Sequence, residues 1–400
     1  MALSETGVAQ NAEDLPPLPL PSGVTARQVP GNPAGLSFHI LEAGFDPTRT
    51  KPLILLLHGY PELAFSWRKV MRPLSSAGFY VVAVDQRGYG RTTGWDTSPY
   101  STVDLSQFTM TRLVGDMLVL VSALGYEEVR CVVGHDFGAV SASFCALMRP
   151  DVFKSVIMMS HPFKPPPALP FNSANLPPSE QQQADMIVGR DIQDGLASLD
   201  PPRMHYKWYN STAQAAQDWG NPPQGLKMFL RGYFHLKSAD WDINKPHPLQ
   251  DWSASELAKM PEYYIMPLSA SMPDVVASNM ANEDVRATEK WLSDEDIGVY
   301  VGEWERNGFQ GALNWYRCQT DPKQTRDLHL FAGKKIDVPS KFITGIADWG
   351  NYQVPGALES YPQSCSDFRG VSFVDNAGHW PQQEQPQLVV EKILRFVTSL

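Results

Sequence analysis

Residues 129–140 constrain the fold of this chain more than any other stretch. A short apolar run rich in β-branched residues predicts a buried strand, which stops at Gly134, where small residues that suit a helix follow. Asp136 lies between the two, with Gly134 and Gly138 two residues to either side. The pattern predicts a tight strand-to-helix turn, a nucleophile elbow, that holds the Asp136 side chain above the edge of a sheet. This motif alone leaves open the alternative of an aspartate that only caps a helix.

Apolar strands and helices alternate on both sides of this turn. Strands are expected at residues 36–42, 52–57, 79–84, 155–159, 340–345 and 371–374, and helices at residues 106–124 and 387–397. Such alternation predicts an α/β fold in which a mostly parallel sheet is covered by helices on both faces.

The alternation is interrupted in the middle of the chain, where prolines cluster and the segments look helical. This change is typical of an inserted domain. We therefore predict an extended N-terminal arm at residues 1–35, an α/β core formed by residues 36–164 and 336–400, and a helical cap domain at residues 165–335.

The charge of the chain argues against nucleic acid or an anionic membrane as a partner, because 43 acidic residues outweigh 33 basic ones and give a formal net charge of −10. No stretch approaches the roughly 18 uninterrupted apolar residues of a membrane span, and no signal-peptide pattern is visible, so we expect a cytoplasmic protein. The four cysteines have no metal-type spacing and are expected to be reduced, with no metal and no cofactor.

Two residues near the C-terminus are suitable partners for Asp136. Asp348 and His379 each follow directly after one of the last two predicted strands. Catalytic groups in open parallel sheets gather beyond the carboxyl ends of the strands, so these side chains are expected to converge in the order nucleophile, acid and histidine. Asp375 is closer to His379 in sequence but lies on the same loop, and we favour Asp348 as the acid that orients the imidazole.

The chain resembles the enzymes of the α/β-hydrolase fold and, among them, the epoxide hydrolases. The resemblance covers residues 36–400, cap included. The matching motifs are His58-Gly59-Tyr60-Pro61, Asp85-Gln86-Arg87-Gly88-Tyr89-Gly90, Gly134-His135-Asp136-Phe137-Gly138, Asp348 and Gly378-His379-Trp380. The resemblance implies an α/β-hydrolase fold with an inserted cap and an enzyme that uses aspartate as its nucleophile.

A carboxylate nucleophile suits substrates that are attacked at tetrahedral carbon. A serine would leave an ether that water does not readily cleave, whereas Asp136 leaves an ester that water can hydrolyse. His379 is expected to activate that water, and Asp348 to orient the imidazole and stabilise its positive charge. The backbone N–H groups of Tyr60 and Phe137 are expected to stabilise the oxyanion that forms on Asp136, by about 3 kcal/mol per donor.

Tyrosines of the cap distinguish an epoxide from other alkyl substrates, because an opening epoxide develops an alkoxide that needs a proton donor. Tyr300 lies in a stretch that resembles the epoxide-hydrolase segment with a donor tyrosine, and Tyr206 resembles the family's other donor, although Tyr209 lies one helical turn away. The alternative is that a cap tyrosine only fills the core. Three tryptophans are expected to line the substrate pocket: Trp67, Trp349 and Trp380.

These features predict a cofactor-independent hydrolase that adds water to a small-molecule epoxide and forms a vicinal diol through an ester on Asp136. A haloalkane or haloacid dehalogenase on the same scaffold is the nearest alternative, but Phe137 and Ala139 supply neither the indole nor the arginine that such enzymes carry beside the nucleophile. A catalytically silent binding protein of this fold is a third alternative. The sequence leaves the oligomeric state open, with a homodimer as one alternative.

Overall fold

A computed structural model describes residues 15–175 and 190–400 of the chain. The fold is built on one eight-stranded sheet with the strand order β1-β2-β4-β3-β5-β6-β9-β10. β2 pairs with β1 and with β4 in antiparallel orientation, and all the other neighbouring strands are parallel. The prediction of an α/β fold with a mostly parallel sheet is therefore confirmed.

The strands of this sheet are short, and those in its centre are buried along their whole length. They are β1 (Val24–Gly31), β2 (Leu36–Ala43), β3 (Leu53–Leu57), β4 (Tyr80–Val84), β5 (Cys131–His135), β6 (Val156–Met159), β9 (Ser340–Gly345) and β10 (Phe368–Val374). All of them except β1 agree within a few residues with strands expected from the sequence.

Helices cover both faces of the sheet. They are α1 (Arg68–Ser76), α2 (Met110–Ala123), α3 (Phe137–Met148), α13 (Tyr361–Ser364), α14 (Pro381–Glu384) and α15 (Pro386–Val397). Leu53, Leu55 and Leu57 of β3 pack with α2 and α3, whereas Ile54 and Leu56 pack with α1 and α15. Because both sides of the strand are buried, its sequence is a continuous apolar run rather than an alternating one.

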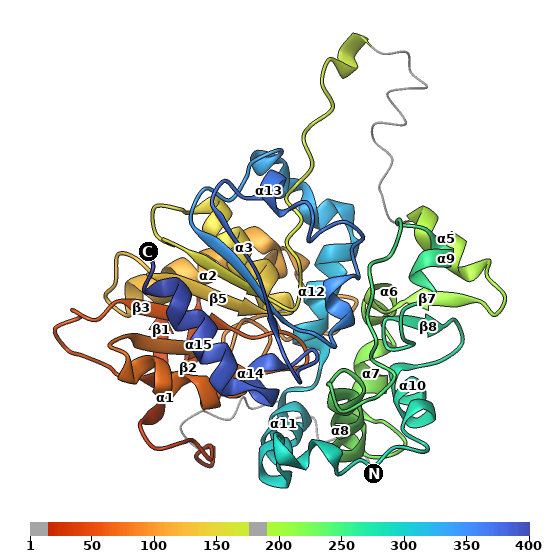
Figure 1. Ribbon diagram of the computed structural model, residues 1–400, viewed down its shortest axis with the longest axis horizontal. Helices are drawn as coiled ribbons and strands as arrows, with labels where there is room; N and C mark the ends of the chain where they lie inside the picture. Colours follow the sequence, from red (N-terminus) through yellow and green to blue (C-terminus); the bar gives the residue numbers. More distant parts are fainter. Residues whose placement is uncertain (1–14, 176–189) are drawn as a thin grey trace.

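The segment between β6 and β9 is mostly helical. It contains α5 (Arg190–Ala197), α6 (Tyr206–Asn210), α7 (Ala215–Gly220), α8 (Leu226–Leu236), α9 (Ala254–Leu257), α10 (Met272–Asn279), α11 (Asp294–Asn307), α12 (Gln310–Thr320) and a two-stranded sheet of β7 (Arg203–His205) and β8 (Ile265–Pro267). Figure 1 shows α5–α10, in green and cyan, gathered beside the sheet-containing part of the molecule. Short 3-10 helices complete the described structure: η2 (Ala64–Trp67), η3 (Leu105–Phe108), η4 (Ser173–Asn175), η5 (Ala287–Lys290), η6 (Pro322–Phe331) and η7 (Trp349–Asn351).

Helices α11 and α12 join this helical segment to the sheet-containing part. The Trp304 indole N–H of α11 donates to the Pro61 carbonyl at 3.0 Å, and the Trp315 indole N–H of α12 donates to the Arg87 carbonyl at 2.9 Å. An ion pair of 2.8 Å between Arg68 and Asp296 adds a further link. These contacts position the helical segment over the loops that follow the strands.

The prediction that residues 1–35 form an extended arm outside the core is wrong for residues 24–31, which form β1 at the edge of the sheet. β1 pairs along its whole length with β2, but among its side chains only Val24 and Val29 are buried. Backbone hydrogen bonds rather than an apolar pattern hold this edge strand, so its sequence gives little sign of it. Residues 1–14 of the predicted arm lie outside the described residues.

Candidate active site

Asp136 lies at the turn between β5 and α3. Its φ of +53° is unusual for a residue with a side chain, and that side chain makes no capping hydrogen bond to α3. A Cβ on Gly134 would lie 1.9 Å from the Gly138 carbonyl oxygen, and a Cβ on Gly138 would lie 2.3 Å from the Leu57 carbonyl oxygen. Only glycine fits at these two positions, so they permit the strained turn that presents the Asp136 carboxylate away from its own helix.

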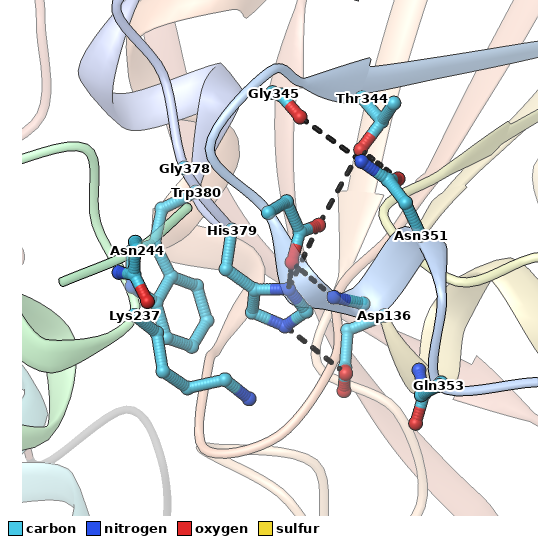
Figure 2. A network of polar contacts seen from close by, with 12 residues as sticks. Asp136, Lys237, Asn244, Thr344, Gly345, Asn351, Gln353, Gly378, His379 and Trp380 are labelled. Carbon is cyan, nitrogen blue, oxygen red and sulfur yellow. Dashed lines mark hydrogen bonds and ion pairs between the residues drawn. The ribbon is translucent and has the colours of Figure 1, made fainter. Parts of the chain in front are cut away.

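His379 lies between two carboxylates that come from distant parts of the chain, as Figure 2 shows. Its Nε2 is 3.2 Å from Asp136 Oδ2, and its Nδ1 is 3.0 and 3.1 Å from the two carboxylate oxygens of Asp348. The Gly350 N–H donates to Asp348 Oδ1 at 2.7 Å and fixes the acid in place. All three side chains are buried. The structure thus brings together the three residues that the sequence predicts to converge.

Asp375, the alternative acid, lies apart from this group. It is exposed in the loop that follows β10, and no hydrogen bond in residues 15–175 and 190–400 joins it to His379. The acid that contacts the imidazole is Asp348.

The turn that follows β3 supplies a backbone donor to Asp136. The Tyr60 N–H donates to Asp136 Oδ1 at 3.0 Å, next to the cis bond between Tyr60 and Pro61. The second expected donor, the Phe137 N–H, makes no hydrogen bond to the Asp136 carboxylate within the described structure. Phe137 is the first residue of α3, so its N–H lies at the positive end of the helix. One of the two expected donors is therefore in contact with the carboxylate.

The surroundings of Asp136 favour its ionised form. Burial on its own would raise the pKa of Asp136, but the hydrogen bond and charge of His379 and the charge of Lys237 outweigh it and hold the pKa well below the usual range. Burial likewise opposes ionisation of Asp348, whose pKa is lowered overall by His379 and by the Gly350 N–H. Both carboxylates are therefore anions at neutral pH, one on each side of the imidazole.

The two tyrosines that the sequence singles out as proton donors lie in different places. Tyr206, at the start of α6, is close enough to Asp136 for that charge to add to burial in raising the pKa of its hydroxyl well above 10. The Tyr300 hydroxyl instead bonds to Ser66 at 2.6 Å and donates to Gln383 at 3.3 Å. The expectation that Tyr300 reaches the reacting carboxylate is thus not met, because the face of α11 that carries Tyr300 docks onto the sheet-containing part.

Tyr316 of α12, which the sequence analysis did not single out, lies beside Phe137 and Tyr206. Its ring lies 5.3 Å from the Phe137 ring and 5.9 Å from the Tyr206 ring, measured between centroids. Burial raises the pKa of Tyr316 well above 10, and the charge of Asp136 adds to that effect. Tyr316 lies in the same aromatic stretch as Tyr300, so the sequence signal was present, but helical spacing alone does not tell which of the two faces Asp136.

The three tryptophans expected in the pocket are divided between two parts of the molecule. Trp380 packs its ring 4.6 Å from the His379 ring, and Trp349 follows directly after Asp348 in the same apolar cluster. Trp67 belongs to the other cluster, between the sheet and helices α1 and α15, and it is fully buried there. The expectation for Trp67 is therefore wrong. As the last residue of η2, it packs against the sheet face covered by α1 and α15 and not beside His379.

A buried acid–base pair that the sequence analysis did not identify supports His379. His135 Nδ1 lies 2.5 Å from Glu62 Oε2, and His135 Nε2 lies 2.5 Å from the backbone carbonyl of His379. Although burial disfavours a charge on either group, their mutual attraction raises the pKa of His135 and lowers that of Glu62. An imidazolium here can donate from both ring nitrogens, which holds the His379 backbone in place. His135 lies within the motif of residues 134–138 and Glu62 directly follows Pro61, which was the available signal.

Glu384 of α14 holds the same loop from its other side. Its carboxylate accepts hydrogen bonds from the Gly378 and Trp380 N–H groups at 3.0 Å, and from the Ala239 N–H at 2.9 Å. The two residues that flank His379 in sequence are therefore tied to the carboxylate of one half-buried glutamate. Nothing in the local sequence around Glu384 indicates this role.

We expect Glu384→Gln to change how stability depends on pH. Burial raises the pKa of Glu384 to about 7 from its ordinary value of 4.5. Between pH 4.5 and about pH 7, Glu384 keeps its proton in the folded protein but loses it in the unfolded chain. The stabilisation from this difference is therefore complete below the unfolded pKa and is lost as the pH rises through the folded pKa of about 7. Between about pH 5 and pH 8, wild type should lose roughly 2 to 3 kcal/mol of unfolding free energy relative to the glutamine variant. Urea unfolding of both proteins at the two pH values measures this, and a constant difference would contradict it.

A cavity of about 230 Å³ adjoins the site, and Phe137 forms part of its wall. Its lining is mainly apolar, with Trp315, Phe108 and Val140 among the contributors, and its basic side chains are His161 and Lys207 together with Lys164. The charge of Asp136 acts on both His161 and Lys207, so the cavity extends from the neighbourhood of the carboxylate.

Residues 15–175 and 190–400 show neither a clustered metal site nor a helix that could span a membrane. They contain no group of three or more His, Cys, Asp and Glu side chains arranged to hold a metal ion. None of their helices combines the length and apolar character that crossing a membrane requires.

Comparison with known proteins adds independent information. A family model described as alpha/beta hydrolase fold matches residues 52–231. Epoxide hydrolase A of Mycobacterium tuberculosis is 32% identical over 373 residues, which are 92% of this chain and 95% of that protein. An epoxide hydrolase from an endophytic Streptomyces superposes with a TM-score of 0.72 at 29% identity, covering 95% of this chain and 96% of that one. Epoxide hydrolase I of potato (Solanum tuberosum) superposes with a TM-score of 0.67 at 28% identity, covering 94% and 100%.

Proposed function

Since the chain belongs to the epoxide hydrolases of the α/β-hydrolase fold, which are hydrolases acting on ether bonds, we propose that it opens its epoxide through a covalent ester on Asp136. The observation that carries this proposal is the position of the Asp136 carboxylate. One oxygen is 3.2 Å from His379 Nε2, and the other accepts the Tyr60 N–H at 3.0 Å. The two oxygens thus have different surroundings, and these suit different tasks.

In the first step, Asp136 Oδ2 attacks an epoxide carbon and the carbon–oxygen bond of the ring breaks. The oxygen that is released takes a proton from the hydroxyl of Tyr206 or Tyr316. Burial keeps the pKa of both tyrosines well above 10, so both hydroxyls hold a proton to give at neutral pH. The product of this step is an alkyl ester of Asp136 that carries a neighbouring hydroxyl group.

In the second step, His379 takes a proton from a water molecule, which attacks the carbonyl carbon of the ester. Negative charge then develops on Oδ1 of Asp136, where the Tyr60 N–H is already in place to stabilise it. Asp348 stabilises the imidazolium that forms. Collapse of the intermediate breaks the bond to the diol oxygen, which takes the proton from His379 and leaves Asp136 as a carboxylic acid. His379 then carries that second proton of the water away to the tyrosinate left by the first step, which restores both the carboxylate and the tyrosine hydroxyl.

We propose that residues 165–335 act as the cap of this site, because Tyr206 and Tyr316 come from that range. The cytoplasmic location and the alternative of a homodimer stay predictions. Sedimentation of the purified protein tests the second of these directly.

The experiment that tests the proposed function is a panel of epoxides and haloacids scored for diol and halide together. We expect diol from epoxides such as styrene oxide and no halide from chloroacetate. A single turnover in ¹⁸O-water should place the label in Asp136 and none in the diol, because the oxygen added to the substrate comes from the enzyme. Label in the diol at the first turnover would overturn the covalent route, and halide release without diol would select the dehalogenase alternative.

The choice between Tyr316 and Tyr300 gives a separate prediction. Tyr206→Phe and Tyr316→Phe should each slow ring opening by about 100-fold, the lower end of the contribution of one general acid, because the other tyrosine remains. Tyr300→Phe is the matched control, since its hydroxyl bonds to Ser66 and Gln383, and it should slow ring opening less than about threefold. Stopped-flow tryptophan fluorescence measures this step. A large effect of Tyr300→Phe with none of Tyr316→Phe would reverse the assignment.

A further inference from the structure

Lys237 places a positive charge in the wall of the site that the reaction steps above do not use. It follows α8, its carbonyl accepts the His379 N–H at 2.8 Å, and the residue is only 3% exposed. Figure 2 shows its side chain extending beside Trp380 and His379 toward Asp136. Burial of an ammonium group is costly unless other groups compensate it, so its surroundings indicate what it is for.

Aromatic rings provide part of that compensation. Nζ of Lys237 lies 4.7 Å from the centre of the Tyr264 ring and 5.2 Å from that of Tyr233, with Trp380 and Tyr263 at 5.6 and 5.7 Å. Its only hydrogen bond within the described residues is a long one of 3.4 Å to the Tyr233 hydroxyl, and none of their carboxylate oxygens lies within 4.0 Å. A lysine ammonium has three donors, so most of its hydrogen-bonding capacity is unmatched by the protein.

Negatively charged residues at longer range partly offset the cost of burying the Lys237 ammonium group. Burial lowers the pKa of Lys237, while the negative charges of Asp136, Asp348 and Glu62 oppose that shift. A further anion in direct contact with Nζ would favour the ammonium form and accept its free donors.

Other buried polar groups around Asp136 also have unused hydrogen-bonding capacity. The Tyr264 hydroxyl and the Gln353 side-chain NH₂ are buried without a hydrogen-bond partner among the described residues. The two are linked through Tyr206, whose ring lies 5.2 Å from that of Tyr264 and whose hydroxyl donates to Gln353 Oε1 at 3.4 Å. Figure 2 shows Gln353 and Lys237 on opposite sides of Asp136. The groups around the nucleophile therefore offer more donors than the protein itself uses.

The side chains that line the adjoining cavity also carry a net positive charge. Its cationic side chains are Lys164 and Lys207, because burial lowers the pKa of His161 to about 4 and leaves that ring neutral at neutral pH, and no aspartate or glutamate of the described chain lines it. The chain as a whole carries a net charge of −10, so the positive charge around this cavity is opposite in sign to that of the whole protein. Such a site attracts a negatively charged ligand by its own field.

From these contacts we propose that Lys237 is a specificity-determining residue and that the preferred substrate is an epoxide with a carboxylate close to the ring. The carboxylate would accept hydrogen bonds from Lys237 Nζ, which lies beside the loop that holds His379. An anchor at that place sets the reacting carbon in front of Asp136, and the cation offsets repulsion between the two carboxylates. This inference rests on the proposed function and adds a substrate class to the same site.

The test compares two compounds that differ only in charge, 3-phenylglycidate and its methyl ester. We expect wild type to favour the acid by at least about tenfold in kcat/KM, as one charge-assisted hydrogen bond implies. Lys237→Met should lower the ratio of acid to ester by at least about 30-fold, mainly through KM for the acid, whereas Lys237→Arg should keep part of the preference. Lys69→Met is the matched control, because Lys69 is a part-buried lysine that donates to the Trp291 carbonyl outside the site.

The outcomes separate the two proposals. If wild type turns over styrene oxide and the ester but does not favour the acid, the substrate class is overturned whether or not any variant folds. Equal losses on both compounds in Lys237→Met would also overturn it and would limit Lys237 to an effect on Asp136. If none of the three epoxides gives a diol, the proposed function fails first. A ratio that falls equally in Lys69→Met would show that general charge, and not the contact, sets the preference.

Discussion

Replacing Asp136 by alanine is expected to lower diol formation by at least about 10⁴-fold, because it removes the atom that bonds to the substrate and no neighbouring group can replace it. Asp348 and His379 can orient water, but Asp348 lies on the far side of the imidazole from Asp136 and is not placed to form the ester. Steady-state turnover of styrene oxide measures the loss, and intact mass spectrometry should show no covalent adduct.

Asp375→Ala is the matched control for this experiment. Asp375 lies on the same loop as His379. Its side chain is exposed, and it makes no hydrogen bond to the imidazole within the described structure. Its loss should leave turnover within about twofold, as is usual for a surface substitution. Retention of a substantial rate in Asp136→Ala would mean that water attacks the epoxide directly, and the covalent route would have to be abandoned.

His379→Gln is expected to stop the reaction after its first half. Asp136 can still attack the epoxide, but the ester is no longer hydrolysed at a useful rate without a base at Nε2, which lies 3.2 Å from the carboxylate in wild type. Turnover should fall by at least about 10³-fold, and the mass of the intact protein should rise by the mass of the substrate. A variant that turns over slowly without accumulating the adduct would contradict this role.

The same variant should also shift the pH dependence of the first half-reaction. In wild type the hydrogen bond and charge of His379 outweigh burial and keep the pKa of Asp136 low, so the nucleophile stays ionised into the acid range. Without the imidazole, burial dominates and the pKa rises, so alkylation should fade at a higher pH than in wild type. Asp348→Asn should slow ester hydrolysis without this large shift, since Asp136 keeps its contact with His379.

Features that depend on short stretches of chain were predictable from the sequence. The spacing of Gly134 and Gly138 around Asp136 pointed to the turn but left a simple helix cap open, and the structure shows that any larger residue at these two positions would collide with backbone. The approach of Asp348 and His379 to Asp136 was predictable as well. Each follows a parallel strand, and the carboxyl ends of such strands meet at one edge of the sheet.

Features that depend on how separate elements dock were not predictable. Tyr300 and Tyr316 belong to the same aromatic stretch, but only the contacts of α11 with Ser66 and Gln383 decide that Tyr300 faces away from the nucleophile. Trp67 is turned to the far side of the sheet for the same kind of reason. β1 is held by backbone bonds to its neighbour, which leave little mark on side-chain pattern.

The sequence by itself therefore determined the sheet, the turn that carries Asp136 and the order of its partners, since these follow from local sterics and from the direction of parallel strands. The tertiary structure alone decided which side chains from the helical segment between β6 and β9 lie near Asp136. Tyr316 and Lys237 reach it through packing between elements far apart in the chain. Such packing energies are collective and non-local, so no single stretch of residues encodes them.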